Sequence, residues 1–170
     1  MKLIRISALL LVLLLTLAVF AGCSGDRYKD DCPAEVITSS IVKEIPVSAG
    51  YLSYGSDFMQ FYLTDAVTPV DDYSVVYSSA ADNYNEIGIL HVKDKKDLET
   101  VENAVSAYLA EFRSTYEQQA QLYDKTEQEK LEDASYTVYG KYVVYMILTD
   151  ADQKTCDGVI EKLLKIEETT

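Results

Sequence analysis

The sequence predicts an α+β fold, a two-layer sandwich in which a four-stranded, mainly antiparallel sheet carries helices packed on one face. Three observations support this prediction. Four short segments are rich in β-branched and aromatic residues, longer segments have apolar residues at helical spacing, and a glycine-led two-residue turn joins the last two strands. The expected order is α-α-ββα-ββα, within a single domain at residues 32–168.

The first half of this domain is expected to hold two helices and two strands. Pro33 can begin a helix because proline is tolerated at the first helical position, and Pro46 ends it because the residue before proline disfavours helical dihedral angles. The second strand alternates, with Ile87, Ile89 and His91 on one face. The expected elements are a helix at residues 33–44, an irregular segment at 47–54, a short helix at 58–63, and strands at 73–78 and 86–92.

The second half is expected to begin with a long amphipathic helix. From Lys95 to Tyr123 this helix would measure about 43 Å, so it either crosses the whole domain or stops near Gln119. The charged run at residues 124–133 is either a solvated extension of that helix or a mobile loop. The last strand is almost wholly apolar, which places it in the centre of the sheet. The remaining elements are strands at 136–139 and 142–148, joined by Gly140-Lys141, and a helix that begins at Asp150 or Asp152.

The first 22 residues have the pattern of a bacterial lipoprotein signal peptide. Lys2 and Arg5 precede an apolar run that is short for a membrane span, which needs about 20 apolar residues. The run ends in Phe20-Ala21-Gly22-Cys23, which resembles a lipobox. We expect a signal peptide at residues 1–22, followed at residues 23–31 by a lipidated Cys23 and a short polar tether. The alternative is an ordinary secretory signal that a cysteine follows by chance.

The charge of the chain excludes some partners. The net charge is −13 at pH 7, and it becomes −15 when residues 1–22 are removed, because that segment holds two basic residues and no acidic one. Nucleic-acid binding is not expected, since it depends on lysine and arginine contacts to phosphates. The expected partners are the membrane, through the N-terminal lipid, and an envelope protein. The expected location is the outer face of the bacterial cytoplasmic membrane.

The cysteines leave one pairing open. Lipidation of Cys23 would leave only Cys32 and Cys156, which could form a disulfide between the two ends of the domain in an extracytoplasmic compartment. The alternative is two separate thiols, one of them buried in the last helix. The chain has no Cys-x-x-Cys motif and His91 is its single histidine, so we expect neither a metal site nor a cofactor.

No arrangement of residues in the sequence indicates catalysis. His91 could act as a general base, but no serine or cysteine nucleophile has an argued place beside it, so we do not expect an enzyme. The 14 tyrosines suggest a different use, because tyrosine combines an apolar body with a polar tip. Tyr51, Tyr54 and Tyr62 cluster near the irregular segment and could line a binding surface, although ordinary packing is the alternative.

Two segments carry a family resemblance. They are Asn85–Asp94, which leads into the long helix, and Gly140–Asp150, which precedes the last helix. Together with the lipobox, they resemble the uncharacterised lipoprotein family catalogued as domain of unknown function 4358, found mainly in Gram-positive Firmicutes, over residues 31–166. The resemblance implies an envelope lipoprotein and brings no established activity, so the anchor Cys23 is the single site residue it supports.

Two functions are therefore expected, in order of preference. The first is a non-enzymatic, lipid-anchored interaction module at the cell envelope. The second is a receptor for a small ligand such as a peptide, glycan or cation. The usual two-lobed receptors are about twice this size, which disfavours the second function, whereas a deep pocket lined by Tyr51, Tyr54 and Tyr62 would favour it.

Overall fold

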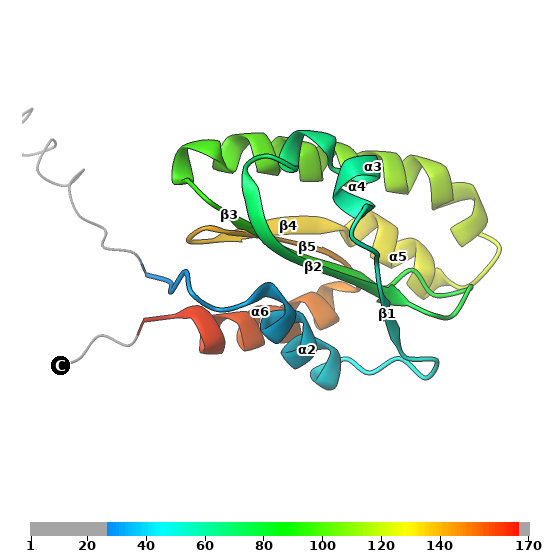
Figure 1. Cartoon of the computed structure of the whole chain (residues 1–170). Coiled ribbons are helices and arrows are strands. Elements are labelled where there is room, and N and C mark those ends of the chain that lie inside the picture. The colour runs from blue at the N-terminus through cyan, green and yellow to red at the C-terminus, as the bar shows by residue number, and fades with distance from the viewer. Residues whose placement is uncertain (1–26, 167–170) are drawn as a thin grey trace, which may run out of the picture.

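The structure, a computed structural model, describes residues 27–166 (Figure 1). The predicted signal peptide and lipobox, including Cys23, lie outside the described residues. The described part combines helices with one open antiparallel sheet, which confirms the mixed α and β prediction. The strands are β1 (Tyr51–Ser53), β2 (Val70–Ser78), β3 (Glu86–Val92), β4 (Ser135–Tyr139) and β5 (Tyr142–Ile147). The helices are α2 (Ala34–Glu44), α3 (Phe58–Tyr62), α4 (Leu98–Ala120), α5 (Lys125–Asp133) and α6 (Asp150–Leu164).

The sheet has five strands, so the prediction of four strands was wrong. Its order is β1-β2-β3-β5-β4, and each neighbouring pair is antiparallel. The additional strand, β1, lies in the segment that was expected to be irregular, and its three residues pair with the end of β2. Such a short strand, next to Gly50 with its positive φ of 81°, has too few residues to show an alternating pattern in the sequence. β5 lies inside the sheet, as its apolar sequence predicts.

Helices cover both faces of the sheet, so the prediction of helices on one face was also wrong. α2 and α6 lie against one face, and α3, α4 and α5 lie against the other (Figure 1). Alternation along β3 explains this arrangement: Ile87 and Ile89 pack towards α2 and α6, and Leu90 and Val92 pack towards α4. All six residues of β5 are buried, and a strand that is apolar on both faces needs a covering layer on each.

The charged run at residues 124–133 is neither a continuation of the long helix nor a mobile loop. α4 ends at Ala120, close to the shorter of its two predicted limits, and a turn leads into the separate helix α5. The side chain of Asp124 caps α5 by accepting a hydrogen bond from the backbone N–H of Glu127. No helix among the described residues has the length and apolar character needed to cross a membrane.

α5 contains a buried ion pair, and one member of the pair is hydrogen-bonded to the turn between β2 and β3. Glu127 and Lys130 are 5% and 4% exposed, and the Lys130 ammonium lies 2.5 Å from the Glu127 carboxylate. The second oxygen of that carboxylate accepts a hydrogen bond of 2.7 Å from the backbone N–H of Tyr84, in the turn between β2 and β3. Glu127, in the charged run at residues 124–133, therefore joins α5 to the turn between β2 and β3.

Substitution of Lys130 by methionine is expected to reduce the free energy of unfolding by about 3 kcal/mol, because it leaves the Glu127 carboxylate buried without its counter-ion. The double variant Glu127→Gln/Lys130→Met should recover part of this loss, since glutamine is neutral and can still accept from Tyr84. Urea unfolding measures both effects. The matched control is Lys125→Met, which removes the exposed Lys125–Glu129 pair and should change stability by less than about 0.5 kcal/mol. Equal effects of Lys125→Met and Lys130→Met would contradict this account.

Candidate functional site

The most unusual buried group is the carboxyl of Glu86 at the start of β3. Glu86 is 1% exposed and accepts hydrogen bonds from three tyrosine hydroxyls. Tyr108 of α4 and Tyr145 of β5 donate to Oε1, each at 2.7 Å, and Tyr54 donates to Oε2 at 3.1 Å. This Glu86 cluster joins the sheet to α4 and to the segment between β1 and α3.

Gly88 makes room for the Glu86 cluster. Gly88 and Tyr145 are paired across β3 and β5, and a Cβ atom on Gly88 would lie only 1.9 Å from the Tyr145 ring. The tyrosine ring therefore lies across the glycine, and its hydroxyl reaches Glu86, two residues earlier on the same face of β3. The sequence Glu-x-Gly at the start of an apolar strand is the local signal for this arrangement, and the sequence reasoning missed it.

Burial controls the protonation of the Glu86 cluster. Desolvation raises the pKa of Glu86 above its ordinary value, and the three hydroxyl donors oppose that effect only in part. Burial, together with the neighbouring carboxyl, also raises the pKa of Tyr54, Tyr108 and Tyr145. A carboxyl enclosed by phenols that keep their protons has no exposed lone pair to offer a substrate. The cluster therefore stabilises the fold.

The structure brings together two of the three tyrosines predicted to line a binding surface. Tyr54 and Tyr62 lie on the α4 side of the sheet, with ring centroids 6.4 Å apart, and Tyr54 also packs on Phe58. Tyr51 belongs to the opposite side, where its hydroxyl donates to the carbonyl of Ile45. Tyr62 is 57% exposed, whereas Tyr54 is held by Glu86. The three tyrosines therefore do not line a common pocket.

His91 forms a pair with a carboxylate but has no nucleophile beside it. Its Nδ1 lies 2.6 Å from Asp71 Oδ1, and its ring packs on Tyr142. Its Nε2, which would face a nucleophile in a catalytic triad, is buried without a hydrogen-bond partner among the described residues. Within residues 27–166, no group of three or more His, Cys, Asp or Glu side chains is placed to hold a metal ion.

Cys32 and Cys156 are both free thiols in the structure. Cys156 lies on the buried face of α6, where burial raises its thiol pKa to about 12. Cys32 is partly buried just before α2, and desolvation together with the charge of Asp31 raises its pKa as well. A raised pKa leaves little thiolate at neutral pH, so neither thiol is an activated nucleophile.

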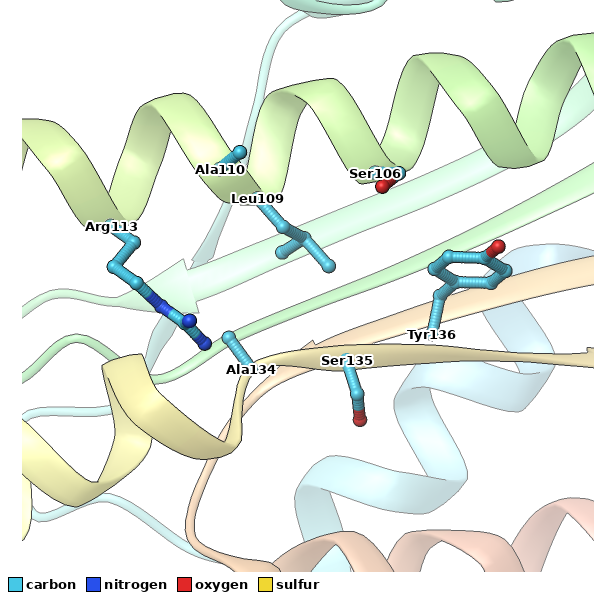
Figure 2. A pocket seen from close by; sticks show the side chains of 7 residues that line it. All are labelled: Ser106, Leu109, Ala110, Arg113, Ala134, Ser135 and Tyr136. Atoms are coloured by element: carbon cyan, nitrogen blue, oxygen red, sulfur yellow. The ribbon is translucent and has the colours of Figure 1, made fainter.

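A groove between α4 and β4 carries polar and apolar groups together. Its volume is about 380 Å³. Figure 2 shows Leu109 and Ala110 of α4 above it, the start of β4 below it, and the Arg113 and Tyr136 side chains near its opposite ends. The residues that line it are Ser106, Leu109, Ala110, Arg113, Ala134, Ser135 and Tyr136.

The outer edge of β4 runs beside the groove and is open. No strand within residues 27–166 pairs with that edge. Because the two-residue turn at Gly140-Lys141 makes Tyr139 and Tyr142 a hydrogen-bonded pair, and such pairs alternate, the backbone N–H and C=O groups of Tyr136 and Val138 point outwards. The side chains of these two residues pack on the α4 side, next to the groove. β4 contains no charged residue and no proline, the devices that commonly protect edge strands.

Arg113 provides the one charge among the seven described residues that line the groove. Its Nε donates to the carbonyl of Leu131 at 2.7 Å, and its Nη2 donates to the carbonyl of Glu132 at 2.6 Å, so it satisfies carbonyls in the last turn of α5. A guanidinium has five N–H donors, which leaves three after these two bonds. No carboxylate of the described chain forms an ion pair with it. Arg113 is the one basic residue of α4, whose other charged residues are all glutamates. The sequence reasoning did not use this signal and missed both this residue and the groove.

Comparison with known proteins gives a family and no relative of known function. A family model described as Domain of unknown function (DUF4358) matches residues 59–148, more than half of the chain, so the chain belongs to this family. The match extends from α3 to the end of β5 and includes the groove and Glu86, whereas α2 and α6 lie outside it. No curated protein and no solved structure gives a significant match. The predicted membership is confirmed, over a shorter region than the expected 31–166.

Replacement of Glu86 by glutamine should change how stability depends on pH. Because the pKa of Glu86 is raised in the folded state, the unfolded chain releases this proton first, and the wild type loses stability as pH rises above about 4.5. Glutamine cannot ionise, so the stability of the wild type minus that of Glu86→Gln should fall between pH 4 and pH 8. Urea unfolding across this range measures the difference. Glu111→Gln, on the exposed side of α4, is the control, and a difference independent of pH would contradict the argument.

Proposed function

We propose that this member of the DUF4358 family is a lipid-anchored, non-enzymatic interaction module on the outer face of the bacterial cytoplasmic membrane, and that the groove between α4 and β4 is its docking site. One observation carries this proposal: a five-residue edge strand without charge or proline lies open beside a groove lined by apolar and polar groups. An edge of this kind is a template for another strand.

Addition of a partner strand uses groups that β4 already presents. The outward N–H and C=O groups of Tyr136 and Val138 can bond to an extended segment, while alternate side chains of that segment point towards α4 and enter the groove. Main-chain hydrogen bonds supply affinity in this binding mode, and the pockets beside the strand supply specificity. Leu109 and Ala110 offer apolar contacts for those side chains.

The other candidate groups of the described residues support an interaction function over chemistry. Glu86 is enclosed by phenols, His91 faces no nucleophile through its Nε2, and the thiols of Cys32 and Cys156 are disfavoured as thiolates. The small-ligand receptor has less support, because Tyr51 lies across the sheet from Tyr54 and Tyr62.

The described part of the chain begins at one end of the fold. Tyr28 bridges to Lys165, and its side chain lies against the turn at Gly140, so the chain joins the folded part before Cys32, where the domain was expected to begin. Cys23 precedes Arg27 by four residues, which span at most about 14 Å. The hairpin turn after β4 would therefore face the membrane, and the start of β4 would face away from it (Figure 1). Arg113 lies beside the start of β4.

Substitution of Cys23 by serine should release the protein from the membrane. Without the thiol no diacylglycerol can be attached, and two or three acyl chains, at about 0.8 kcal/mol for each buried methylene, account for firm anchoring. Detergent-phase partition of cell extracts measures the effect: more than about nine-tenths of the wild type should enter the detergent phase, and less than about one-tenth of Cys23→Ser. Cys32→Ser is the control and should partition as the wild type does. Equal partition of Cys23→Ser and the wild type would refute the anchor.

A photo-crosslinking residue at position 110 should capture a partner that the same residue at position 107 does not. Ala107 and Ala110 are both exposed on α4, but only Ala110 lines the groove, so the two variants share the effect on the helix and differ in access to the site. Irradiation of intact cells followed by electrophoresis measures the adducts, and about tenfold more adduct is expected at position 110.

A substitution that blocks the groove shows whether the adduct is specific. An added Ser106→Trp substitution, which fills the groove, should remove the adduct at position 110 without changing the thermal unfolding midpoint. Equal adducts at positions 107 and 110, or no adduct at either, would contradict a docking site in the groove.

A further inference from the structure

We propose that the ligand of this groove is the C-terminal segment of another polypeptide, added as a strand antiparallel to β4, with its free carboxylate bound by Arg113. The inference rests on the proposed function and gives it a chemical class of partner. It follows from three features of the groove: the direction of β4, the position of the one charge, and the apolar wall between them.

The direction of β4 determines where an added strand ends. β4 begins at Ser135, beside Arg113, and ends at Tyr139 in the turn to β5 (Figure 2). An antiparallel strand therefore runs from the turn towards Arg113 and has its C-terminal end there. A parallel strand would instead bring its N-terminal ammonium towards the same guanidinium, which like charges oppose. Arg113 thus selects the antiparallel orientation.

The positive charge of Arg113 at that end of the groove favours a ligand whose own chain ends there. Three N–H donors of Arg113 are free of its two carbonyl contacts. Glu117 and Glu132 line a smaller cavity on the other side of Arg113, yet neither forms an ion pair with it among the described residues. Hydrogen bonds from guanidinium to carboxylate are short and strong and often bidentate, so a free α-carboxylate is a fitting ligand. A strand that continued past this point would offer only a neutral amide.

The apolar wall of the groove determines which side chains of the ligand fit. In an added strand, the residue opposite Tyr136 points to the same face as Tyr136, towards Leu109 and Ala110. Aliphatic side chains fit this wall, which has no charge between Arg113 and Tyr136. The preferred ligand therefore has aliphatic residues at alternate positions before its terminus.

A second copy of this chain is a less suitable occupant. Each mature copy would carry a net charge of −15, so two copies repel one another, most strongly at low salt. An edge-to-edge pair of β4 strands would also leave both Arg113 side chains without a carboxylate from a chain terminus.

Two pools of N-acetylated random hexapeptides test the inference, one with free C-terminal carboxylates and one with C-terminal amides. The full-length protein is purified in detergent and immobilised, the retained peptides are identified by mass spectrometry, and the affinity of the best free acid is compared with that of its own amide. We expect the free acid to bind about tenfold to a hundredfold more tightly, with aliphatic residues at alternate positions. Arg113→Gln should remove the preference for the acid, and Arg113→Lys should retain part of it.

The controls separate this inference from the proposed function. Arg113→Gln can also weaken the end of α5, so its unfolding midpoint is measured, and the comparison of acid with amide on the wild-type protein needs no variant. Acid and amide bound equally, with loss of both in Ala110→Glu, would overturn the carboxylate inference and leave the docking site intact. If no peptide were retained but the crosslink at position 110 were present, the carboxylate inference would again be overturned and the docking site would stand. Sedimentation that shows a dimer abolished by Ala110→Glu would assign the groove to a second copy.

Discussion

The constraint on which the structure depends is that β3 and β5 bury apolar residues on both faces. A pair of strands of this kind cannot leave either face in water, because each exposed leucine, isoleucine or valine would forgo roughly 1.5 to 3 kcal/mol of burial. Two helical layers follow from this one requirement, with α4 on one side and α2 with α6 on the other. Position in the sheet then decides which backbone groups are paired. The inner strands β2, β3 and β5 have a neighbouring strand on each side, whereas the edge strands β1 and β4 have one neighbour each among the described residues.

A carboxyl inside this core is acceptable because hydrogen bonds satisfy it. Glu86 lies on the α4 side of β3, where an unbonded charge would be costly, and three hydroxyls from three separate parts of the chain satisfy it. The requirement for Gly88 shows how specific this solution is, since a larger residue there would displace the Tyr145 ring. The network therefore fixes β5, α4 and the segment before α3 relative to β3. Tyr108 directly precedes Leu109 of the groove, so the network also positions this part of α4 on the sheet.

Sequence reasoning recovered the elements that repeat a simple pattern and missed those that depend on contacts between distant residues. The alternation of β3, the central place of β5 and the start of α2 follow from local composition. The continuous apolar run of β5 was itself a sign of two covered faces, and the one-faced prediction did not use it. α5 was not predictable, because a buried Glu127–Lys130 pair has the composition of a solvated run. Tyr54 and Tyr62, which were predicted to line a binding surface, lie together but outside the groove. Arg113 and β4 form a candidate site only after the chain brings residues of α4 to the sheet edge.

The two edges of the sheet show why β4 is the place where a partner is expected. β1 has three residues, and so short an edge offers little to an added strand. β4 has five, with outward backbone groups beside an apolar wall and no charge or proline of its own. An edge without protection favours indiscriminate pairing, and lipid anchoring would raise the local concentration of copies. The net negative charge of the protein opposes pairing between copies, while Arg113 at one end of the groove favours a ligand that ends in a carboxylate. The choice between partners at this edge then depends on Arg113 and on the net charge of the protein. β4 itself needs no charge or proline, so its outward backbone groups stay available to a partner strand.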